Sequence, residues 1–350
     1  MGAAVACTEM VSAKGLVLGQ SHKNNATNDL LATFPPLEPP IRRAAREVQY
    51  PYQNEEESAL RSLGRVASDT PLVVQLFGAE APFMEEAVHI LREKGYCWFD
   101  LNMGCSVPKV GKSGAGSAML QDPDNALRVA ERMLAAAGTG RVGFKLRLGR
   151  DTGEEVYLEL GKALADAGAG WLTLHPRYAR QKFTGTADWN AVRPLVAAVA
   201  VPVMVSGDLF TPADGVAALE ASGAAGVMFA RGAMHNPAIF GQFTSLLHGG
   251  NGAGKERRFV DGSLLEKVIR RHAALIRAFY PVRMNRQGIE SGLLKMRTFV
   301  PRYVKECAGA RFLRRSMASC TTWRDMETLL NEFFGDAANL RIASGEEEGA

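Results

Sequence analysis

The sequence predicts an α/β protein with a barrel of the TIM type. Short runs rich in Val, Ile, Leu and Phe alternate with stretches whose apolar residues recur at three- and four-residue spacing. Continuous apolar runs are typical of parallel strands buried on both faces, and the wider spacing is typical of the helices that cover them. Because the alternation repeats over the first two thirds of the chain, we expect a parallel sheet covered by helices.

Seven apolar runs are expected to form strands. A closed (β/α)8 barrel has eight strands, so one strand is missing from this count. The expected strands are Ala3–Glu9, Leu72–Phe77, Cys97–Asn102, Val142–Arg147, Trp171–His175, Val201–Ser206 and Gly226–Ala230.

Two segments between these strands have clear helical patterns. They are "APFMEEAVHILREKG" (81–95) and "EVYLELGKALADAGA" (155–169), and each closes near a glycine suited to a C-terminal cap. Residues 20–60 carry Pro, Asn and mixed charge without periodicity, which indicates an extended loop or insertion. We therefore expect a barrel domain over residues 1–248 that contains this insertion.

The C-terminal part of the chain is expected to be a separate helical domain. A glycine-rich linker is predicted over residues 249–262, and residues 263–340 show apolar positions at helical spacing. The patterns are clearest in "LLEKVIRRHAALIRAFY", "GLLKMRTFVPRYVKE" and "TTWRDMETLLNEFF". Residues 341–350 are polar and expected to be a disordered tail.

The charge of the chain is unevenly distributed. Residues 251–324 hold 17 Lys and Arg against 5 Asp and Glu, whereas the first 250 residues have a net charge of −2. A basic C-terminal third indicates a surface that binds a polyanion such as a nucleic acid. The alternative is a solvated helical face without a ligand.

The cysteines indicate a reducing compartment. The five cysteines form an odd number without a CxxC pair, which fits neither a disulfide framework nor a zinc site. The longest apolar run, residues 195–205, has about half the length that a bilayer span needs, and no basic segment precedes an apolar N-terminal stretch. We expect a cytoplasmic protein with free thiols, no metal site and no membrane segment.

Polar residues follow most of the expected strands. In a barrel of this type the active site lies at the carboxyl ends of the strands. Glycines after the last two strands would offer backbone N–H groups to a phosphate, which predicts a phosphorylated cofactor. The polar strand-end residues are Glu9, Gln75, Asn102, Cys105, Lys145, Arg147, His175, Arg177, Ser206, Gly207, Asp208, Arg231 and Gly232.

Lys145 is expected to extend its ammonium group into the mouth of the barrel. An unpaired charge is costly there, so an electron-rich partner is needed. A reduced flavin ring would be such a partner, and an ion pair with a neighbouring carboxylate is the alternative.

Several motifs resemble those of tRNA-dihydrouridine synthases. In chain order they are "TEMVSAKGL", "VVQLFG", "DLNMGCSVPKVGKSGAGSAML", "FKLR", "LTLHPRYARQKFTGTADW" and "GVMFARGAMHNPAIF". The cysteine loop and the H-x-R-x-x-x-Q segment are the most specific of these. The resemblance spans nearly the whole chain and includes the basic helical region. It implies an FMN enzyme that reduces the C5–C6 double bond of selected uridines in tRNA, with NADPH or NADH as reductant.

The resemblance also assigns a role to Cys105. This residue matches the general acid of the family, which gives a proton to C5 while the reduced flavin delivers a hydride to C6. A thiol suits this role because its reference pKa of about 8.5 keeps it protonated at neutral pH. Taken alone, a single cysteine is more often an inert buried thiol.

Further residues receive roles by the same match. Gln75, Asn102, Lys145 and His175 correspond to contacts with the flavin ring or the reacting base. The phosphate end of the cofactor corresponds to Ser206, Gly207, Asp208, Ala230, Arg231 and Gly232. Contacts with substrate or RNA are expected from Lys109, Lys112, Arg147, Arg177, Gln181, Arg297 and Arg302.

The sequence departs from the family pattern in places. The first barrel strand and its loop, which help to bind FMN in the family, are expected to be missing. Ser106, Ser206 and Ala230 stand where the family prefers proline, asparagine and glycine. Two alternatives remain open: an FMN barrel oxidoreductase acting on a small molecule, and a flavin-free tRNA-binding protein. We expect a monomer.

Overall fold

The computed structural model describes residues 3–19, 72–249, 262–279, 283–305 and 307–336. Within these ranges the chain forms two compact units. The sheet unit comprises residues 3–207 and 217–228, and the helical unit comprises residues 208–216 and those from 229 onward. The two units are described separately below.

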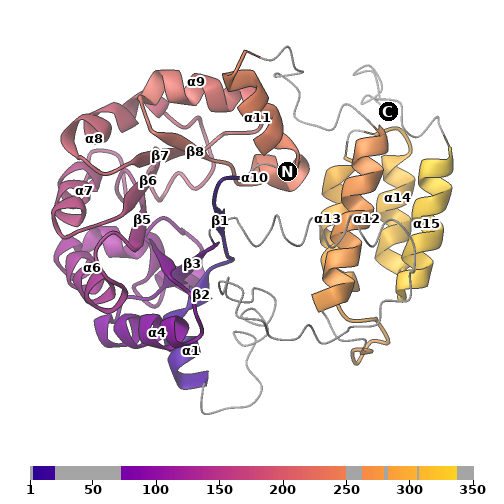
Figure 1. Ribbon diagram of the computed structural model, residues 1–350, viewed down its shortest axis with the longest axis horizontal. Helices are drawn as coiled ribbons and strands as arrows, with labels where there is room; N and C mark the ends of the chain where they lie inside the picture. Colours follow the sequence, from indigo (N-terminus) through magenta and orange to yellow (C-terminus); the bar gives the residue numbers. More distant parts are fainter. Residues whose placement is uncertain (1–2, 20–71, 250–261, 280–282, 306, 337–350) are drawn as a thin grey trace. The chain divides into compact units, whose positions relative to one another are not determined.

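The sheet unit contains one parallel sheet, which confirms the α/β class. Along the sheet the strand order is β1-β3-β4-β5-β6-β7-β8, and β2 also pairs with β3. Among the described residues no pairing joins β8 to β1, and Figure 1 shows an open arc with α4, α6, α7 and α8 on its outer side. The strands are β1 Ala6–Cys7, β2 Val11–Ser12, β3 Leu72–Phe77, β4 Trp98–Asn102, β5 Val142–Arg147, β6 Trp171–His175, β7 Val203–Ser206 and β8 Gly226–Met228.

The first expected strand was wrong in its extent. Instead of one strand over Ala3–Glu9, two short strands pair with β3, and residues 8–10 between them lie opposite only residues 74 and 75. The extra residue interrupts the ladder, as in a β-bulge. Thr8 bridges the interruption, because its backbone N–H donates to Val73 O (3.0 Å) and its hydroxyl accepts from Gln75 N (3.1 Å). The remaining strands lie where the sequence predicted them, within about two residues at each end, which is the usual uncertainty of such boundaries.

The helices of the sheet unit follow the predicted alternation. The two patterns at 81–95 and 155–169 form α4 and α7, which end before Gly95 (φ 91°) and Gly168 (φ 106°). These left-handed glycines stop both helices at the expected places. The described helices here are α1 Ala13–Gly19, α4 Ala81–Glu93, α5 Pro108–Gly111, α6 Pro123–Ala137, α7 Tyr157–Asp166 and α8 Arg193–Ala198, with the 3₁₀ turns Gly116–Gln121 and Trp189–Val192, and α9 Pro212–Ser222 begins in the helical unit and ends in this one.

The two faces of the sheet differ sharply in chemistry. Residues paired across parallel strands point to the same side, so the pairs Gln75 with Asp100, Asn102 with Lys145, and Arg147 with His175 define one polar face. We call it the inner face. The alternate residues pack under the helices and have 0% exposure; they include Val74, Leu76, Phe99, Leu101, Phe144, Leu146, Leu172 and Leu174. The helices therefore bury the apolar face and leave the polar one for a site.

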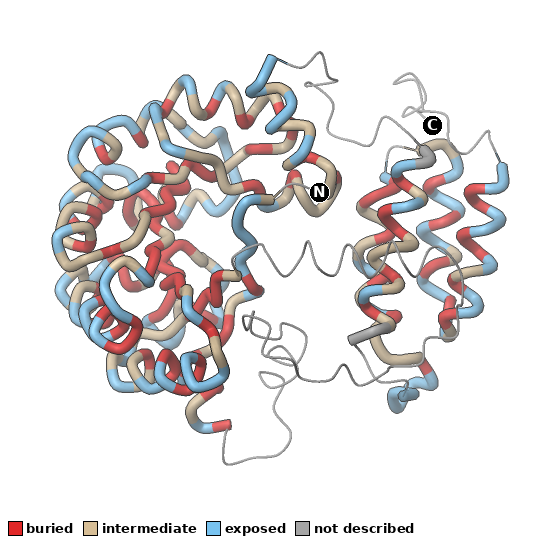
Figure 2. The backbone as a smooth tube through the Cα atoms, viewed as in Figure 1, coloured by how far each residue is buried: buried red, intermediate tan, exposed pale blue. Residues whose placement is uncertain are grey.

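The helical unit confirms the expected small all-α bundle. Its core is a cluster of buried apolar side chains, and Figure 2 marks the buried residues in red along the backbone of the helices. The elements are α10 Arg231–His235, α11 Ile239–Leu247, α12 Gly262–Phe279, α13 Leu293–Tyr303, α14 Ala310–Ser319 and α15 Trp323–Gly335. Helix α14 lies within the range predicted to be helical, but its own pattern was not recognised, because its three arginines hide a narrow apolar stripe made by Ala310, Leu313 and Met317.

Some expectations fall outside the described residues. They are the insertion at 20–60, most of the linker at 249–262 and the tail at 341–350. The boundaries of the domains at 248 and 263 stay predictions; the contacts group residues 208–216 and 229–249 with the C-terminal helices. None of the described helices has both the length and the apolar character that a membrane span requires.

Candidate active site

A directional chain of hydrogen bonds runs along the inner face from β3 and β4 to the cysteine loop. Asn102 Oδ1 accepts from the backbone N–H groups of Gly104 (3.2 Å) and Cys105 (2.9 Å). Asn102 Nδ2 donates to Gln75 Oε1 at 2.8 Å, and Gln75 Nε2 donates to Asp100 Oδ1 at 2.7 Å. Two residues expected at the cofactor, Gln75 and Asn102, are thus joined to the loop of the expected general acid.

Asp100 is a site residue that was not predicted from the sequence. It is 2% exposed, and burial raises the pKa of its carboxyl to about 6, against the opposing effects of the Gln75 hydrogen bond and the Lys145 charge. The signal in the sequence was its spacing. Asp100 lies two residues before Asn102 on one strand, so both side chains point to the inner face.

The loop after β4 holds Cys105 at its start. The carbonyl oxygen of Cys105 accepts from Ser117 N at 2.9 Å, which closes the loop. Gly116 has φ 65°, and a Cβ there would lie 2.6 Å from the Cys105 carbonyl oxygen. The glycine-rich sequence is therefore required for close backbone packing beside Cys105, whose side chain is half-buried. Ser106 is also half-buried, and Lys109 and Lys112 are exposed on and just after the short helix α5.

Lys145 lies on β5 beside Asn102 and is half-buried. Desolvation lowers the pKa of its ammonium group, and the charge of Asp100 opposes this effect. No hydrogen bond or ion pair joins Lys145 Nζ to another described residue. Within the described chain, the alternative of a contact ion pair is thus not realised, and the group remains available for an electron-rich ligand.

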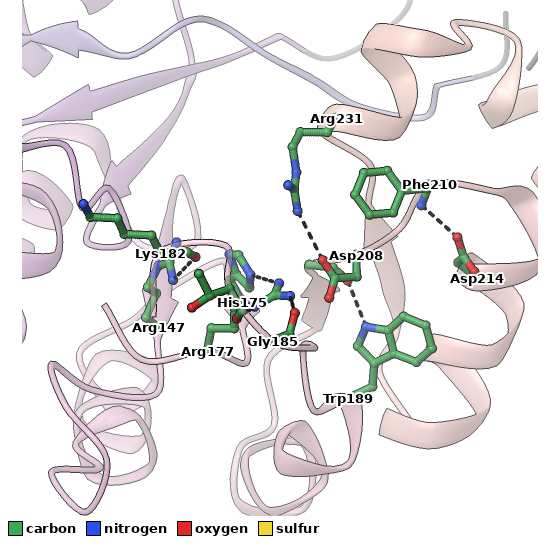
Figure 3. A network of polar contacts seen from close by, with 12 residues as sticks. Arg147, His175, Arg177, Lys182, Gly185, Trp189, Asp208, Phe210, Asp214 and Arg231 are labelled. Atoms are coloured by element: carbon green, nitrogen blue, oxygen red, sulfur yellow. Dashed lines mark hydrogen bonds and ion pairs between the residues drawn. The ribbon is translucent and has the colours of Figure 1, made fainter. Parts of the chain in front are cut away.

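His175 at the end of β6 is held by Arg177. Arg177 is 1% exposed, and its guanidinium group lies 3.2 Å from His175 Nε2 and donates to the carbonyl oxygens of Thr184 (3.2 Å) and Gly185 (2.6 Å) (Figure 3). Because a guanidinium group can only donate, Nε2 accepts and the imidazole carries its proton on Nδ1. Arg177 thereby fixes both the ring and the following loop.

Arg147 has a similar role on the neighbouring strand. It is 3% exposed, and it donates to the carbonyl oxygens of Gly104 (2.8 Å), Tyr178 (3.1 Å) and Lys182 (2.9 Å). Figure 3 shows its guanidinium group directed at Lys182. One side chain therefore ties the cysteine loop to the loop after β6. Arg147 and Arg177, both expected at substrate or RNA, are buried and bound to backbone groups of the protein.

The loop after β6 presents an aromatic ring to solvent. Gln181 Oε1 accepts from Tyr178 N at 2.7 Å, and Lys182 has the unusual φ of 51° for a residue with a side chain. Phe183 follows; it is 57% exposed, and its ring centroid lies 6.4 Å from that of His175 and 5.8 Å from the Arg147 guanidinium carbon. Phe183 was not predicted as a site residue, although an aromatic residue between Gln181 and Gly185 is visible in the sequence.

The loop after β7 packs closely against His175. Ser206 is buried at the end of the strand, and Gly207 has φ 101°. A Cβ on Gly207 would lie 2.6 Å from His175 Cδ2, and its carbonyl oxygen accepts from Trp189 Nε1 at 2.9 Å (Figure 3). Glycine at this position allows the backbone to reach the imidazole ring.

Further expected phosphate-end residues lie in the helical unit. Asp208 has φ 55°, and its Oδ1 accepts from Arg231 Nη2 at 3.1 Å (Figure 3). Arg231 also lies over the Phe210 ring, 4.8 Å from its centroid. Gly232 is buried against the Leu209 carbonyl, and Ala230 is exposed just before α10.

Arg297 and Arg302 make contacts inside the helical unit. Arg297 Nε donates to Cys320 O at 3.0 Å, and its Nη2 donates to the same oxygen. Arg302 Nη1 donates to Met234 Sδ at 3.7 Å and lies over the Phe299 ring. Exposed arginines of this unit include Arg311, Arg314, Arg315 and Arg324.

The residues of the inner face fit a planar ring that has acceptor atoms. Lys145 Nζ and His175 Nδ1 are donors, and each amide nitrogen of Gln75 and Asn102 has a second N–H beyond the bond described above. Reduced flavin has such an acceptor-rich, electron-rich edge. Among the described residues no group of three or more His, Cys, Asp or Glu is placed to hold a metal ion.

Comparisons with known proteins point to one family. The model of the family described as dihydrouridine synthase (Dus) matches residues 41–339. A probable tRNA-dihydrouridine synthase of Rhodobacter capsulatus is 34% identical over 261 residues, covering 75% of this chain and 76% of the relative. A probable tRNA-dihydrouridine synthase 1 of Synechocystis sp. is 31% identical, covering 79% of this chain and 76% of the relative.

Other similarities are weaker. A tRNA-dihydrouridine synthase B of Pseudomonas syringae pv. tomato is 30% identical over 75% of this chain and 74% of the relative. A solved structure of morphinone reductase in complex with tetrahydroNAD covers 61% of this chain and 79% of its own at a TM-score of 0.38 and 13% identity, which is too low to support a conclusion. On the family model and the curated relatives, this chain belongs to the dihydrouridine synthase family.

Proposed function

We propose that this protein reduces the C5–C6 double bond of uridines in tRNA to give 5,6-dihydrouridine, with FMN as cofactor and NADPH or NADH as reductant. The carrying observation is that the cysteine loop of a dihydrouridine synthase family member is fixed on a polar inner face, beside Lys145, which makes no ion pair or hydrogen bond with another described residue. Family membership supports the substrate, and the donor groups of the inner face support the flavin.

The inner face of the sheet unit would hold the ring of the cofactor. Gln75, Asn102, Lys145 and His175 offer donors to the ring. At the end of β7, Ser206 offers a hydroxyl group to the phosphate, and Gly207 offers a backbone without a side chain. When bound and reduced, FMN would supply the hydride for C6 of the uracil ring.

Cys105 would supply the proton for C5. Its backbone N–H is bonded to Asn102, its carbonyl to Ser117, and the preceding carbonyl to Arg147. Three fixed points around one half-buried residue hold the thiol in place without engaging it, so it remains free to transfer its proton.

The RNA would meet exposed groups near the cysteine. A uridine inside folded tRNA has to leave its stack to reach the inner face, and an exposed aromatic ring can stack against such a base. Phe183 offers that ring, and Lys109 and Lys112 offer cations for the backbone. The exposed arginines of the helical unit favour this proposal over a small-molecule oxidoreductase, which would not need them. We further propose that the protein acts as a monomer in the cytoplasm.

The test is the substitution Cys105→Ala, with Cys97→Ala as its matched control. Cys97 is an exposed free thiol at the opposite end of β4. We expect Cys105→Ala to bind FMN as the unmodified protein does and to form dihydrouridine at least ~10²-fold more slowly, because general acid catalysis contributes about that much. Flavin absorbance and mass spectrometry of nucleosides from tRNA lacking dihydrouridine measure the two effects. Unchanged product formation by Cys105→Ala would contradict the role of the thiol.

Two other outcomes of these binding measurements would favour the alternative functions. If the purified protein stays colourless with added FMN and still binds tRNA, the flavin-free binding protein is the correct interpretation. If flavin binds but tRNA is neither bound nor reduced, the substrate is a small molecule.

A further inference from the structure

The hydrogen bonds between Asp100 and Cys105 allow each amide only one orientation. Asn102 Oδ1 accepts two backbone N–H groups, at Gly104 and Cys105, so its Nδ2 must face Gln75. Gln75 Oε1 accepts from that nitrogen, so Gln75 Nε2 must face away from Asn102. The group it meets is a carboxylate oxygen of Asp100, which is an acceptor.

This orientation decides what the inner face offers a ligand. Each amide nitrogen carries two N–H bonds, and one of them is used within the chain of contacts. The second N–H of Gln75 and of Asn102 remains, whereas both amide oxygens are already engaged. Asn102 Oδ1 accepts two bonds and Gln75 Oε1 accepts one, so with the Lys145 ammonium group beside them these residues present mainly donors.

Asp100 is the last acceptor in this series of hydrogen bonds, and because it is buried, water cannot take its place. It is 2% exposed, and the charged or titratable groups that act with it are Lys145 on β5 and Cys7 on β1. Burial raises its pKa to about 6, so at neutral pH the ionised form, with two acceptor oxygens, predominates. Within the described residues, the Asp100 carboxylate makes no contact ion pair with Lys145, so such a pair does not account for a buried carboxylate here.

We propose that Asp100 is a positioning residue: its carboxylate fixes the amide of Gln75, and through Gln75 and Asn102 it sets the backbone at Cys105 and the donor-rich character of the inner face. The ligand class this selects is a ring edge rich in acceptor atoms. The role of these hydrogen bonds in catalysis rests on the proposed function, whereas the hydrogen bonds themselves are independent of it.

The test compares Asp100→Asn with Asp100→Leu in the full-length protein. Asparagine keeps an acceptor oxygen for Gln75 Nε2, and leucine removes it. Hydrogen exchange of the Gly104 and Cys105 amides is measured first, without flavin or tRNA. We expect Asp100→Leu to lower the protection of these amides about tenfold, as the loss of a buried hydrogen bond does, and Asp100→Asn to retain most of it.

The second readout is the dissociation constant of FMN. We expect it to rise about tenfold or more in Asp100→Leu and much less in Asp100→Asn, because only leucine releases the Gln75 amide. Ser222→Ala is the control for general loss of a buried polar group, since the Ser222 hydroxyl bonds within and just after α9. If Asp100→Leu does not fold, Gln75→Leu breaks the same link from the other side and is expected to lower the same protection.

Equal defects in Asp100→Asn and Asp100→Leu would overturn the proposal, because charge rather than hydrogen bonding would then be responsible. Unchanged amide protection in Asp100→Leu would also overturn it. A failure of the unmodified protein to make dihydrouridine would contradict the proposed function alone, since amide protection is measured without either ligand.

Discussion

Buried arginines organise the site at the scale of single residues. Arg147 and Arg177 are 3% and 1% exposed, and their guanidinium groups bond to backbone carbonyls of neighbouring loops. An arginine fork can serve several acceptors at fixed angles, which a lysine cannot do. Sequence alone marked both residues as site residues but could not decide between a ligand and the protein's own backbone as their partner.

Arg147→Met tests this organising role. We expect the protein to lose about 1–3 kcal/mol of stability, because three carbonyl oxygens lose their buried donor, and to lose activity as the cysteine loop detaches. Denaturant unfolding and dihydrouridine formation measure the two effects. Arg180→Met is the control, since Arg180 is exposed and its ion pair with Asp151 lies at the surface. Equal stability of the two variants would show that the Arg147 contacts contribute little.

The raised pKa of Asp100 makes a prediction about pH. Between its ordinary value of 3.8 and about 6 the folded protein holds a proton that the unfolded chain releases, so stability contributed by this group falls as pH rises through that window. We expect the stability of the unmodified protein relative to Asp100→Asn to fall on the order of 2 kcal/mol over it. Urea unfolding of both proteins across this range is the measurement. A difference that does not vary with pH would contradict the shift.

At the scale of elements, a β-bulge between β1 and β2 contributes to the position of the site residues. The register shift between β1 and β2 lets the Thr8 hydroxyl, in place of a backbone group, accept from Gln75 N. Strands β3 to β8 were predictable because their apolar runs are continuous. The bulge and the individual pattern of helix α14 were not, because the first depends on how β3 pairs and the second on a stripe that only packing makes visible.

The loop after β4 depends on one glycine. Gly116→Ala places a Cβ 2.6 Å from the Cys105 carbonyl oxygen at a residue with φ 65°. We expect the loop to shift and dihydrouridine formation to fall about tenfold or more, because small displacements of catalytic groups are costly. Gly111→Ala in the same loop is the control, since nothing lies within 4 Å of a Cβ there. Product formation is measured as for Cys105→Ala, and equal activity of the two glycine variants would refute the prediction.

At the scale of the whole molecule, charge is divided along the chain. The first 250 residues have a net charge of −2, while residues 251–324 carry an excess of Lys and Arg. The structure divides these cations into two groups. Arg297 and Arg302 donate hydrogen bonds within the helical unit, whereas other arginines, such as Arg311 and Arg314, are exposed. Clustered exposed cations are what binding of an RNA backbone requires.

The salt dependence of tRNA binding tests this division of roles. We expect affinity to fall steeply with KCl concentration, and Arg311→Gln and Arg314→Gln each to lower the slope by about one unit if they contact phosphates. Fluorescence anisotropy with labelled tRNA provides the slope. Arg270→Gln is the control, because Arg270 is already paired with Glu266. An unchanged slope in both exposed variants would place the RNA contacts elsewhere.

The sequence by itself determined the α/β class, the helical C-terminal unit, the family and the identity of Cys105 as a candidate acid; the family model confirms the resemblance. These properties depend on local periodicity and on motifs, which a single chain displays. Only the tertiary structure decided that Asp100 closes the amide chain, that Arg147 joins two loops and that Phe183 stands exposed beside His175. Each of these contacts joins residues from different strands or loops, and the partner of a polar group is set by which segments the fold brings together.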